Sequence, residues 1–403
     1  MHIKQLCLRD SRLLADQLPA LAAIDPQLLL VFAAPDFFAD ASNSTRLQTA
    51  LPGCVLLGCS TAGEISSQGV EDHALVLTAI RFSHTRVQAA TTLLHDMADS
   101  RAAGARLARQ LDTNALQLVL VLGQGVAING SAMLEGMRSV LGSHLPIVGG
   151  LAADDAAFRR TFTLGPQGSS DHALVAVGLS GQQLRLGHGS FGGWSTFGPV
   201  RKVTRCHDNI LYELDGAPAL EVYKRYLGEY AADLPGSGLL FPFSMLGDDL
   251  QETGIIRTIM GVDEEQGSIT LASELETGCH LKLMHASTNS LVQGAEAAAS
   301  AACQPQDASG DSLAILVSCV GRKLVMGDRV DEEIEAVTDA LGSATVLAGF
   351  YSNGEISPFA PGQPSRLHNQ TMTITTLFET GESADCTAHS LQAQATGTSC
   401  KTF

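Results

Sequence analysis

The sequence lacks the features that mark several large classes of protein. Its nine cysteines include no C-x-x-C pair and are odd in number, which argues against a disulfide framework and suits a reducing cytoplasm. The N-terminus has no apolar signal-peptide core, and no apolar run approaches the ~20 residues that span a bilayer. We therefore expect a soluble cytoplasmic protein with no membrane partner.

Positive charge is also scarce. Lys and Arg number 25 against 42 Asp and Glu, which gives a formal net charge of -17 over 403 residues. Nonspecific binding to nucleic acid requires clustered cations that contact phosphates, and the sequence contains no such cluster. The 45% hydrophobic content is sufficient for a full core, and the length is sufficient for two domains. The composition thus indicates an acidic globular protein with no nucleic-acid partner.

One short stretch occurs twice, and a weaker copy lies between the two. Residues 55–66 (VLLGCSTAGEIS) and 346–357 (VLAGFYSNGEIS) share the spacing of two glycines and a glutamate. Residues 145–152 repeat the apolar run and the glycines, followed by Asp154 and Asp155 in place of the glutamate. At such glycines the backbone can adopt a positive φ or approach another group closely. The repetition predicts a duplicated architecture.

A second apolar run lies upstream of each copy, at 28–34, 117–123 and 312–318, with a helical pattern between the two runs. Each unit is therefore strand, helix, strand, which predicts a parallel pair. Residues 238–285 alternate instead and predict a β-meander. The expected fold class is α/β, with two domains built from repeated strand-helix-strand units and a β-meander insertion in the C-terminal half.

The predicted domain boundary lies in the least regular segment of the chain. Residues 187–199 contain five glycines and a proline, which argues against a regular element. We therefore expect α/β domains over 1–187 and 188–382. The small, polar residues of 383–403 predict a disordered tail.

Several residues could support catalysis. Glu64 and Glu355 could form a pair for acid–base chemistry if their units face each other. Alternatively, each accepts backbone N–H groups in its own turn, which we regard as the better explanation. Ser60 does not lie in a G-x-S-x-G nucleophile elbow, and residues 123–125 (GQG) lack the third glycine of a dinucleotide fingerprint. We expect no catalytic residue and no enzymatic activity.

Taken together, these motifs resemble the FIST family of intracellular sensory proteins over nearly the whole chain. The N-terminal half is similar to the FIST N domain through residues 58–64 and 149–150. The C-terminal half is similar to the FIST C domain through residues 212–216, 218–221, 352–356 and 368–371. The family resemblance implies a sensor of small ligands. Residues 187–189 (GHG) and 192–194 (GGW) are similar to the NosP branch, which binds haem and reports nitric oxide.

This resemblance implies a b-type, non-covalently bound haem, since no C-x-x-C-H occurs. A haem pocket needs one imidazole or thiolate for the iron and apolar walls for the porphyrin. His188 is the first candidate ligand because its flanking glycines leave room beside a planar group, with His368 and His285 as alternatives. A histidine bonded to backbone in a turn is the structural explanation of each. The remaining expected cofactor-binding residues are Phe191, Trp194, Phe197, Gly349, Gly354 and Glu355.

The expected signal is nitric oxide or another small ligand. The expected output is association with a histidine kinase or a cyclic-di-GMP enzyme, because the chain has no kinase, cyclase or DNA-binding motif of its own; a homodimer is compatible with this role. A FIST sensor of an organic metabolite such as an amino acid is the first alternative, with Glu64, Glu355 and turn amides binding its polar ends. A hydrolase or transferase that uses these two glutamates is the second.

Overall fold

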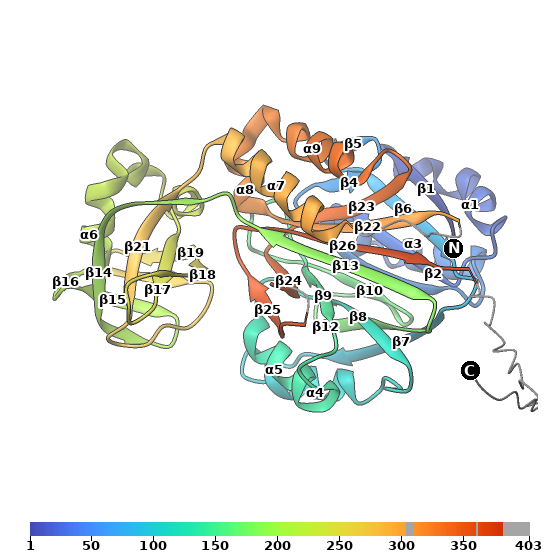
Figure 1. Ribbon diagram of the computed structural model, residues 1–403, viewed down its shortest axis with the longest axis horizontal. Coiled ribbons are helices and arrows are strands. Elements are labelled where there is room, and N and C mark those ends of the chain that lie inside the picture. Colours follow the sequence, from blue (N-terminus) through green and yellow to red (C-terminus); the bar gives the residue numbers. More distant parts are fainter. Residues whose placement is uncertain (304–309, 360–361, 382–403) are drawn as a thin grey trace, which may run out of the picture.

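The computed structural model describes residues 1–303, 310–359 and 362–381, and consists of a larger body joined to a smaller one (Figure 1). We call residues 1–193 together with the described part of 286–381 the ring, and residues 195–285 the lobe. The predicted α/β class is confirmed, while the predicted tail at 383–403 lies outside the described residues. Of the helices in these described ranges, none has the length and apolar composition needed to cross a membrane.

The ring contains the three predicted units, each with a parallel pair of strands. The pairs are β2 (Leu28–Ala33) with β3 (Val55–Ser60), β8 (Leu116–Gly123) with β9 (Ile147–Leu151), and β22 (Ser312–Cys319) with β23 (Thr345–Ser352). Antiparallel strands extend each pair on one side: β6 (Leu75–Arg81) and β1 (His2–Leu8), β12 (Ala173–Ser180) and β7 (Arg86–Leu93), β26 (Met372–Glu379) and β13 (Leu184–Phe191). The repeat read from the sequence is therefore structural.

A hairpin after each parallel pair crosses into the sheet of a neighbouring unit. The hairpins are β4 (Glu64–Ser66) with β5 (Gly69–Glu71), β10 (Thr163–Gly165) with β11 (Gly168–Ser170), and β24 (Gly354–Pro358) with β25 (Ser365–His368). They extend β23, β3 and β9 respectively, so each unit gives one hairpin and receives one. This cyclic exchange joins the third unit to the first two. The predicted division between residues 187 and 188 falls inside β13.

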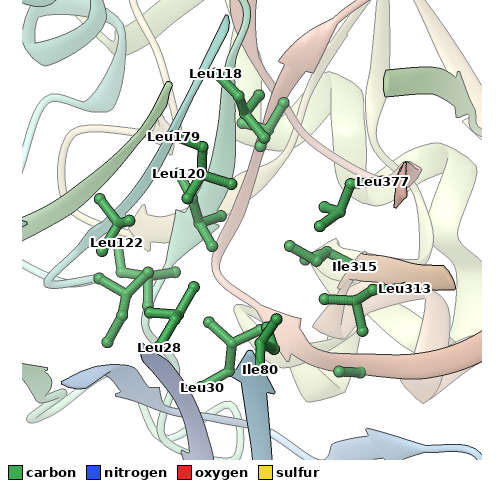
Figure 2. Close-up of a cluster of buried hydrophobic side chains, with 14 of the residues drawn as sticks. Leu28, Leu30, Ile80, Leu118, Leu120, Leu122, Leu179, Leu313, Ile315 and Leu377 are labelled. Atoms are coloured by element: carbon green, nitrogen blue, oxygen red, sulfur yellow. The ribbon is translucent and has the colours of Figure 1, made fainter. Parts of the chain in front are cut away.

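The three sheets pack against one another in the interior of the ring (Figure 2). Buried side chains from all three units meet there, among them Leu28, Leu30, Ile80, Leu118, Leu120, Leu122, Leu179, Leu313, Ile315 and Leu377. Burial of each such side chain contributes about 1.5–3 kcal/mol. Helices cover the outer faces: α1 (Leu14–Ala22) and α3 (Ala41–Ala50), α4 (Ser100–Ala108) and α5 (Gly130–Leu141), α7 (Thr288–Ala302) and α9 (Asp331–Leu341). Burial on both faces explains why central strands such as β2 and β22 are almost entirely apolar.

The repeated glycines Gly58, Gly149 and Gly349 lie within strands β3, β9 and β23. A Cβ atom at these positions would lie 2.2, 1.9 and 2.0 Å from a backbone carbonyl oxygen of the parallel partner strand. Real side chains do not fit at such distances, so glycine is required for the close approach of the two strands. Of the two reasons for glycine given above, a positive φ and a close approach of the backbone, close approach thus applies at all three positions.

The strands predicted at 238–285 are present, although they pair with strands of 195–214 as well as with one another rather than in the chain order of a meander. Together with residues 195–237 they form the lobe, on the left of Figure 1. Its strands are β14 (Ser195–His207), β15 (Ile210–Leu214), β16 (Ala217–Pro218), β17 (Phe243–Leu246), β18 (Glu252–Arg257), β19 (Ile259–Asp263), β20 (Ser268–Leu271) and β21 (His280–His285). Helix α6 (Ala219–Leu227) packs against them around Tyr223. The lobe thus has a hydrophobic core of its own.

The expectation that residues 187–199 form no regular element is wrong. Strand β13 continues to Phe191, and β14 begins at Ser195. Gly187 and Gly189 belong to β13, where a Cβ atom would lie 2.0 and 1.9 Å from carbonyl oxygens of α7. The glycines therefore allow a helix to pack closely on a strand, and only the short link 192–194 joins the two strands.

Candidate functional site

Three hollows lie along the contact between ring and lobe. The central hollow has a volume of about 500 Å³ and is lined from the ring by residues 97–98, 125–126, 128–130, Leu151, Asn353, Leu367 and Asn369, and from the lobe by 208–209, Met260 and 270–274. A groove of about 630 Å³ shares Met260 with it. A small hollow of about 140 Å³ shares Leu367 and Asn369 with it. The three hollows thus follow one another along the same contact.

The central hollow lies at the carboxyl ends of ring strands. Gly125 follows β8, Leu151 ends β9, and Asn353 connects β23 to β24. Asn353 Nδ2 donates to the Gly125 carbonyl oxygen at 3.2 Å, and Gly125 N donates to Thr161 Oγ1 at 2.8 Å. The carboxyl ends of parallel strands are where α/β folds bind ligands. The hollow therefore lies where an α/β fold can bind a ligand.

The polar side chains that line the central hollow are amides, carboxylates and the hydroxyls of Thr270 and Ser273. Asn129 caps α5 by accepting a hydrogen bond from Ala132 N at 3.0 Å, and its Nδ2 donates to Glu274 Oε1 of the lobe at 3.0 Å. Asn353 Oδ1 is buried and has no hydrogen-bond partner among the described residues. Asp208 adds a second carboxylate from the lobe. The hollow therefore offers mainly hydrogen-bond acceptors.

The turn at 369–370 connects the hollows to the lobe and to the link. Asn369 lines both the central and the small hollow. Gln370 is fully buried with a left-handed φ of 64°, and its Nε2 donates to the Leu239 carbonyl oxygen of the lobe at 2.9 Å. Its own carbonyl oxygen accepts a hydrogen bond from Trp194 Nε1 of the link at 2.8 Å. Gln370, the neighbour of Asn369, is therefore hydrogen-bonded both to the lobe and to the link.

A buried ion pair holds the link against the ring. The side chain of Arg322, in α8 (Val320–Met326), is inaccessible to solvent and lies 2.7 Å from Glu333 Oε2. Arg322 also donates to the carbonyl oxygens of Gly192 and, at 2.9 Å, of Leu291. Tyr351 donates its hydroxyl to Glu333 at 2.5 Å. Both charges are therefore compensated, as burial requires.

Glu64 and Glu355 each stabilise their own turn. Glu64 accepts a hydrogen bond from Ala74 N at 2.9 Å. Glu355 accepts from Ser352 Oγ at 3.0 Å and from Thr371 N at 3.1 Å. Burial raises the pKa of Glu64 to about 7 and that of Glu355 to about 8, against the hydrogen bonds that favour the ionised forms. Each carboxyl group thus ties a turn to the start of the next antiparallel strand.

The counterpart of these glutamates in the second unit is Thr163. Glu64 and Glu355 stand opposite the residue after the repeated glycine of another unit, and Thr163 occupies the same register. The prediction that Asp154 and Asp155 replace the glutamate is wrong, because the second unit has a longer loop before its hairpin. The Asp154 carboxylate instead accepts hydrogen bonds from the amides of residues 158–160 at 2.7–2.9 Å.

The three candidate iron ligands lie apart. His188 lies on the same face of β13 as Leu184, toward the ring interior, with Nδ1 3.2 Å from Thr375 Oγ1. Burial lowers its pKa to about 4, and its Nε2 has no hydrogen-bond partner among the described residues. His368 Nε2 lies 3.0 Å from the Ser357 carbonyl oxygen, at the small hollow. His285 is exposed at the end of β21.

The aromatic and glycine candidates do not gather around His188 either. Phe191 is 44% exposed, Trp194 lies in the link, and the Phe197 ring contacts His285 with centroids 5.4 Å apart. Gly349 is enclosed in its sheet, and Gly354 lies beside Leu151 and Leu367. These residues thus lie at the end of β13 and in the link, in the lobe, and in the sheets of the ring.

A haem site would need open space beside one of these histidines. The space beside Gly187 and Gly189 is filled by the backbone of α7, so it cannot accept a planar group. The hollow beside His368, at about 140 Å³, is smaller than the range of about 300–1,000 Å³ that is usual for cofactor sites. Within the described ranges, no three His, Cys, Asp or Glu side chains gather into a metal site. The arrangement does not fit haem.

Sequence reasoning missed most of the central hollow. Asn129, Asp208, Glu274, Asn353 and Asn369 come from loops far apart in the chain. No local spacing connects them, because the ring and the lobe bring them together only after folding. The one local signal was Gly125, which belongs to the incomplete dinucleotide fingerprint at residues 123–125.

Two family models match the chain. The model described as FIST N domain matches residues 27–217, and the one described as FIST C domain matches residues 219–358. "Uncharacterized protein MJ1623" of Methanocaldococcus jannaschii is 35% identical over 97 residues, which is 23% of this chain and only 18% of that protein. A cyanuric acid hydrolase from A. caulinodans aligns over 94% of this chain and 99% of its own, with 9% identity and a TM-score of 0.35. That structural likeness is too weak to carry an argument.

Proposed function

Because this chain belongs to the FIST family, with an N and a C domain in tandem, we propose that it senses a small organic ligand bound in the central hollow. FIST domains mark signal-transduction proteins that sense small ligands. The observation that carries the proposal is the position of the hollow, between two separately folded bodies and at the carboxyl ends of strands. Its volume of about 500 Å³ suits a metabolite of moderate size.

A ligand in this position can produce a signal by binding alone. It would contact the ring and the lobe together and so favour one arrangement of the two bodies over others. The turn at 369–370 lines the hollow and hydrogen-bonds both the link and the lobe. We propose that the altered arrangement changes association with a histidine kinase or a cyclic-di-GMP enzyme, and that the chain itself catalyses no reaction.

The position of the ligand site can be tested by filling the hollow. Pools of metabolites are screened for compounds that raise the Tm of the full chain, and each active compound is then tested on Ala98→Trp. Ala98 is exposed and lines the hollow from the ring, so the indole fills ligand space with little strain. Ala15→Trp is the matched control, because Ala15 is an exposed alanine at a hollow between α1 and α3.

The proposal predicts that Ala98→Trp abolishes the Tm increase and that Ala15→Trp preserves it. If an active compound stabilises both variants as it does the parent protein, the ligand binds elsewhere and the proposed site is wrong.

Haem binding with nitric oxide as its signal is the second candidate function. One observation favours it, namely the buried His188 Nε2 without a hydrogen-bond partner among the described residues. Because His188 points toward the ring interior, on the face of β13 opposite to α7, haem ligation would require the interior beside His188 to repack. Purified protein supplied with haem should then show a Soret band that His188→Ala removes. A colourless preparation contradicts this candidate.

A further inference from the structure

The charge that lines the central hollow is one-sided. Among the described residues that line it, the ionisable side chains are Asp208 and Glu274, and no Lys, Arg or His is present. Arg257 lies near Glu274, but its Nε donates to the backbone carbonyl oxygen of that residue at 3.1 Å rather than to the carboxylate. A molecule inside the hollow therefore meets two carboxylates and no lining cation.

One feature of the hollow favours the opposite charge. Helix α5 begins at this hollow, and a helix N-terminus carries about half a positive charge. Asn129 compensates part of it, since its side chain accepts a hydrogen bond from Ala132 N at 3.0 Å. Two full negative charges outweigh the remaining fraction. The balance inside the hollow is negative.

The ring wall supplies an acceptor that lacks a donor. Asn353 Nδ2 donates to the Gly125 carbonyl oxygen at 3.2 Å, while its Oδ1 has no partner among the described residues. A buried amide oxygen without a donor is unfavourable. Because this oxygen is inaccessible to solvent, it can accept from a ligand N–H group only if the Asn353 side chain turns toward the hollow. Asn129 meanwhile holds Glu274 Oε1 at 3.0 Å, which fixes that carboxylate relative to the ring.

Part of the remaining lining is apolar, beside the polar side chains of Asn209, Thr270, Ser273 and Asn369. Met97 and Val126 are 50% and 37% exposed, which is unusual for such side chains, and Met260 lies on the lobe side. An apolar group placed against them would remove this surface from water, with a gain of roughly 25 cal/mol per Å² buried. Carboxylates, an amide acceptor and apolar side chains are thus present within one hollow.

We infer that the ligand of the central hollow is an organic amine. Its ammonium group binds between the carboxylates of Asp208 and Glu274 and the Asn353 amide, and its apolar stem lies along Met97 and Val126. The inference rests on the proposed function, which places the ligand in this hollow. It excludes ligands recognised through carboxylate or phosphate groups, including the propionates of haem.

Three probes of equal chain length separate charge from apolar contact. Hexylammonium, hexanol and hexanoate are titrated into the full chain, and binding is measured by ligand-observed NMR. We expect hexylammonium to bind up to about fivefold tighter than hexanol, the ratio that one partly exposed ion pair supports, and hexanoate to bind most weakly. The preference should shrink as salt is raised.

Substitutions then assign the preference to the lining carboxylates. The double variant Asp208→Asn/Glu274→Gln should bind hexylammonium and hexanol with equal affinity. The control Glu335→Gln/Asp339→Asn removes the same charge from a hollow on the outer surface beside α9, and should keep the parent ratio.

The outcomes separate this inference from the proposed function. If Ala98→Trp abolishes binding of all three probes but hexanoate binds the parent protein as well as hexylammonium does, the amine is wrong and the site stands. If hexylammonium binds Ala98→Trp as it binds the parent protein, both the amine and the site are wrong. If it binds neither protein, the amine is wrong and the site is decided by the Tm screen.

Discussion

Replacement of Glu355 by glutamine should remove a fall in stability with rising pH. Glu355 is inaccessible to solvent, and burial raises its pKa from the ordinary 4.5 to about 8. The folded chain therefore holds this proton more tightly than the unfolded chain does. The contribution of Glu355 to folding stability is fully present below pH 4.5 and is lost as pH rises toward 8. Between pH 6.5 and 8.0 these two pKa values imply a loss of about 1.5 kcal/mol.

Glutamine keeps the shape of the neutral carboxyl group. Its oxygen can accept from Thr371 N and from Thr371 Oγ1, and its NH₂ group can donate to Ser352 Oγ, so the three present hydrogen bonds are retained. The free energy of unfolding is measured with urea at pH 6.5 and 8.0 under reducing conditions. The parent protein should lose about 1.5 kcal/mol more than Glu355→Gln over this interval. Any contribution of Glu64 is common to both proteins and cancels.

The exposed Glu335→Gln is the control for the same chemical change, and it should leave the pH dependence as in the parent protein. Equal slopes for Glu355→Gln and the parent protein would refute the reasoning, because they would show that Glu355 is already ionised at pH 6.5 when folded.

Three further substitutions test other parts of the structure. Arg322→Met leaves the buried Glu333 without its cation and should lower the free energy of unfolding, measured with urea, by about 3–5 kcal/mol. The double variant with Glu333→Gln should recover part of this loss, and no recovery would contradict the pairing. Gly349→Ala should cost about 3 kcal/mol because its Cβ would meet a carbonyl oxygen at 2.0 Å, whereas Gly236→Ala, which enters open space, should stay within about 0.5 kcal/mol. Gln370→Gly keeps the left-handed turn but removes the hydrogen bond to the lobe. Amides of the lobe should therefore exchange faster with solvent than in the parent protein, while amides of the ring interior should not. Lobe exchange equal to that of the parent protein would show that this bond does not hold the lobe.

The sequence was sufficient to predict the repeated units. Apolar runs such as 28–34 and 312–318 are strands because both of their faces are buried, and the periodic segments between runs became helices. The repeated glycines marked close strand contacts. All of these are local patterns whose meaning depends on one unit alone.

The exchange of hairpins could not be read from the sequence. Glu64 and Glu355 look alike because each ties a turn to a strand, but nothing near them states that their hairpins pair with another unit. The same holds for 187–189, where the glycines leave room for α7 and not for a ligand. A glycine shows that space is needed without showing which group fills it.

The proposed ligand site was predictable only in its general place. A site at strand ends where two parts of the chain meet follows from the α/β pattern. Its residues do not, because Asn129 and Glu274 become neighbours only when the lobe folds against the ring. The polar residues of such a hollow carry no sequence spacing of their own.

Hydrogen–deuterium exchange of the full chain, with and without a compound that raises its Tm, tests the central claim most directly. The account predicts that amides of 125–130 in the ring and 270–274 in the lobe are protected together, because the ligand contacts both. Protection of one of these segments without the other, or protection confined to the strand around His188, would contradict it.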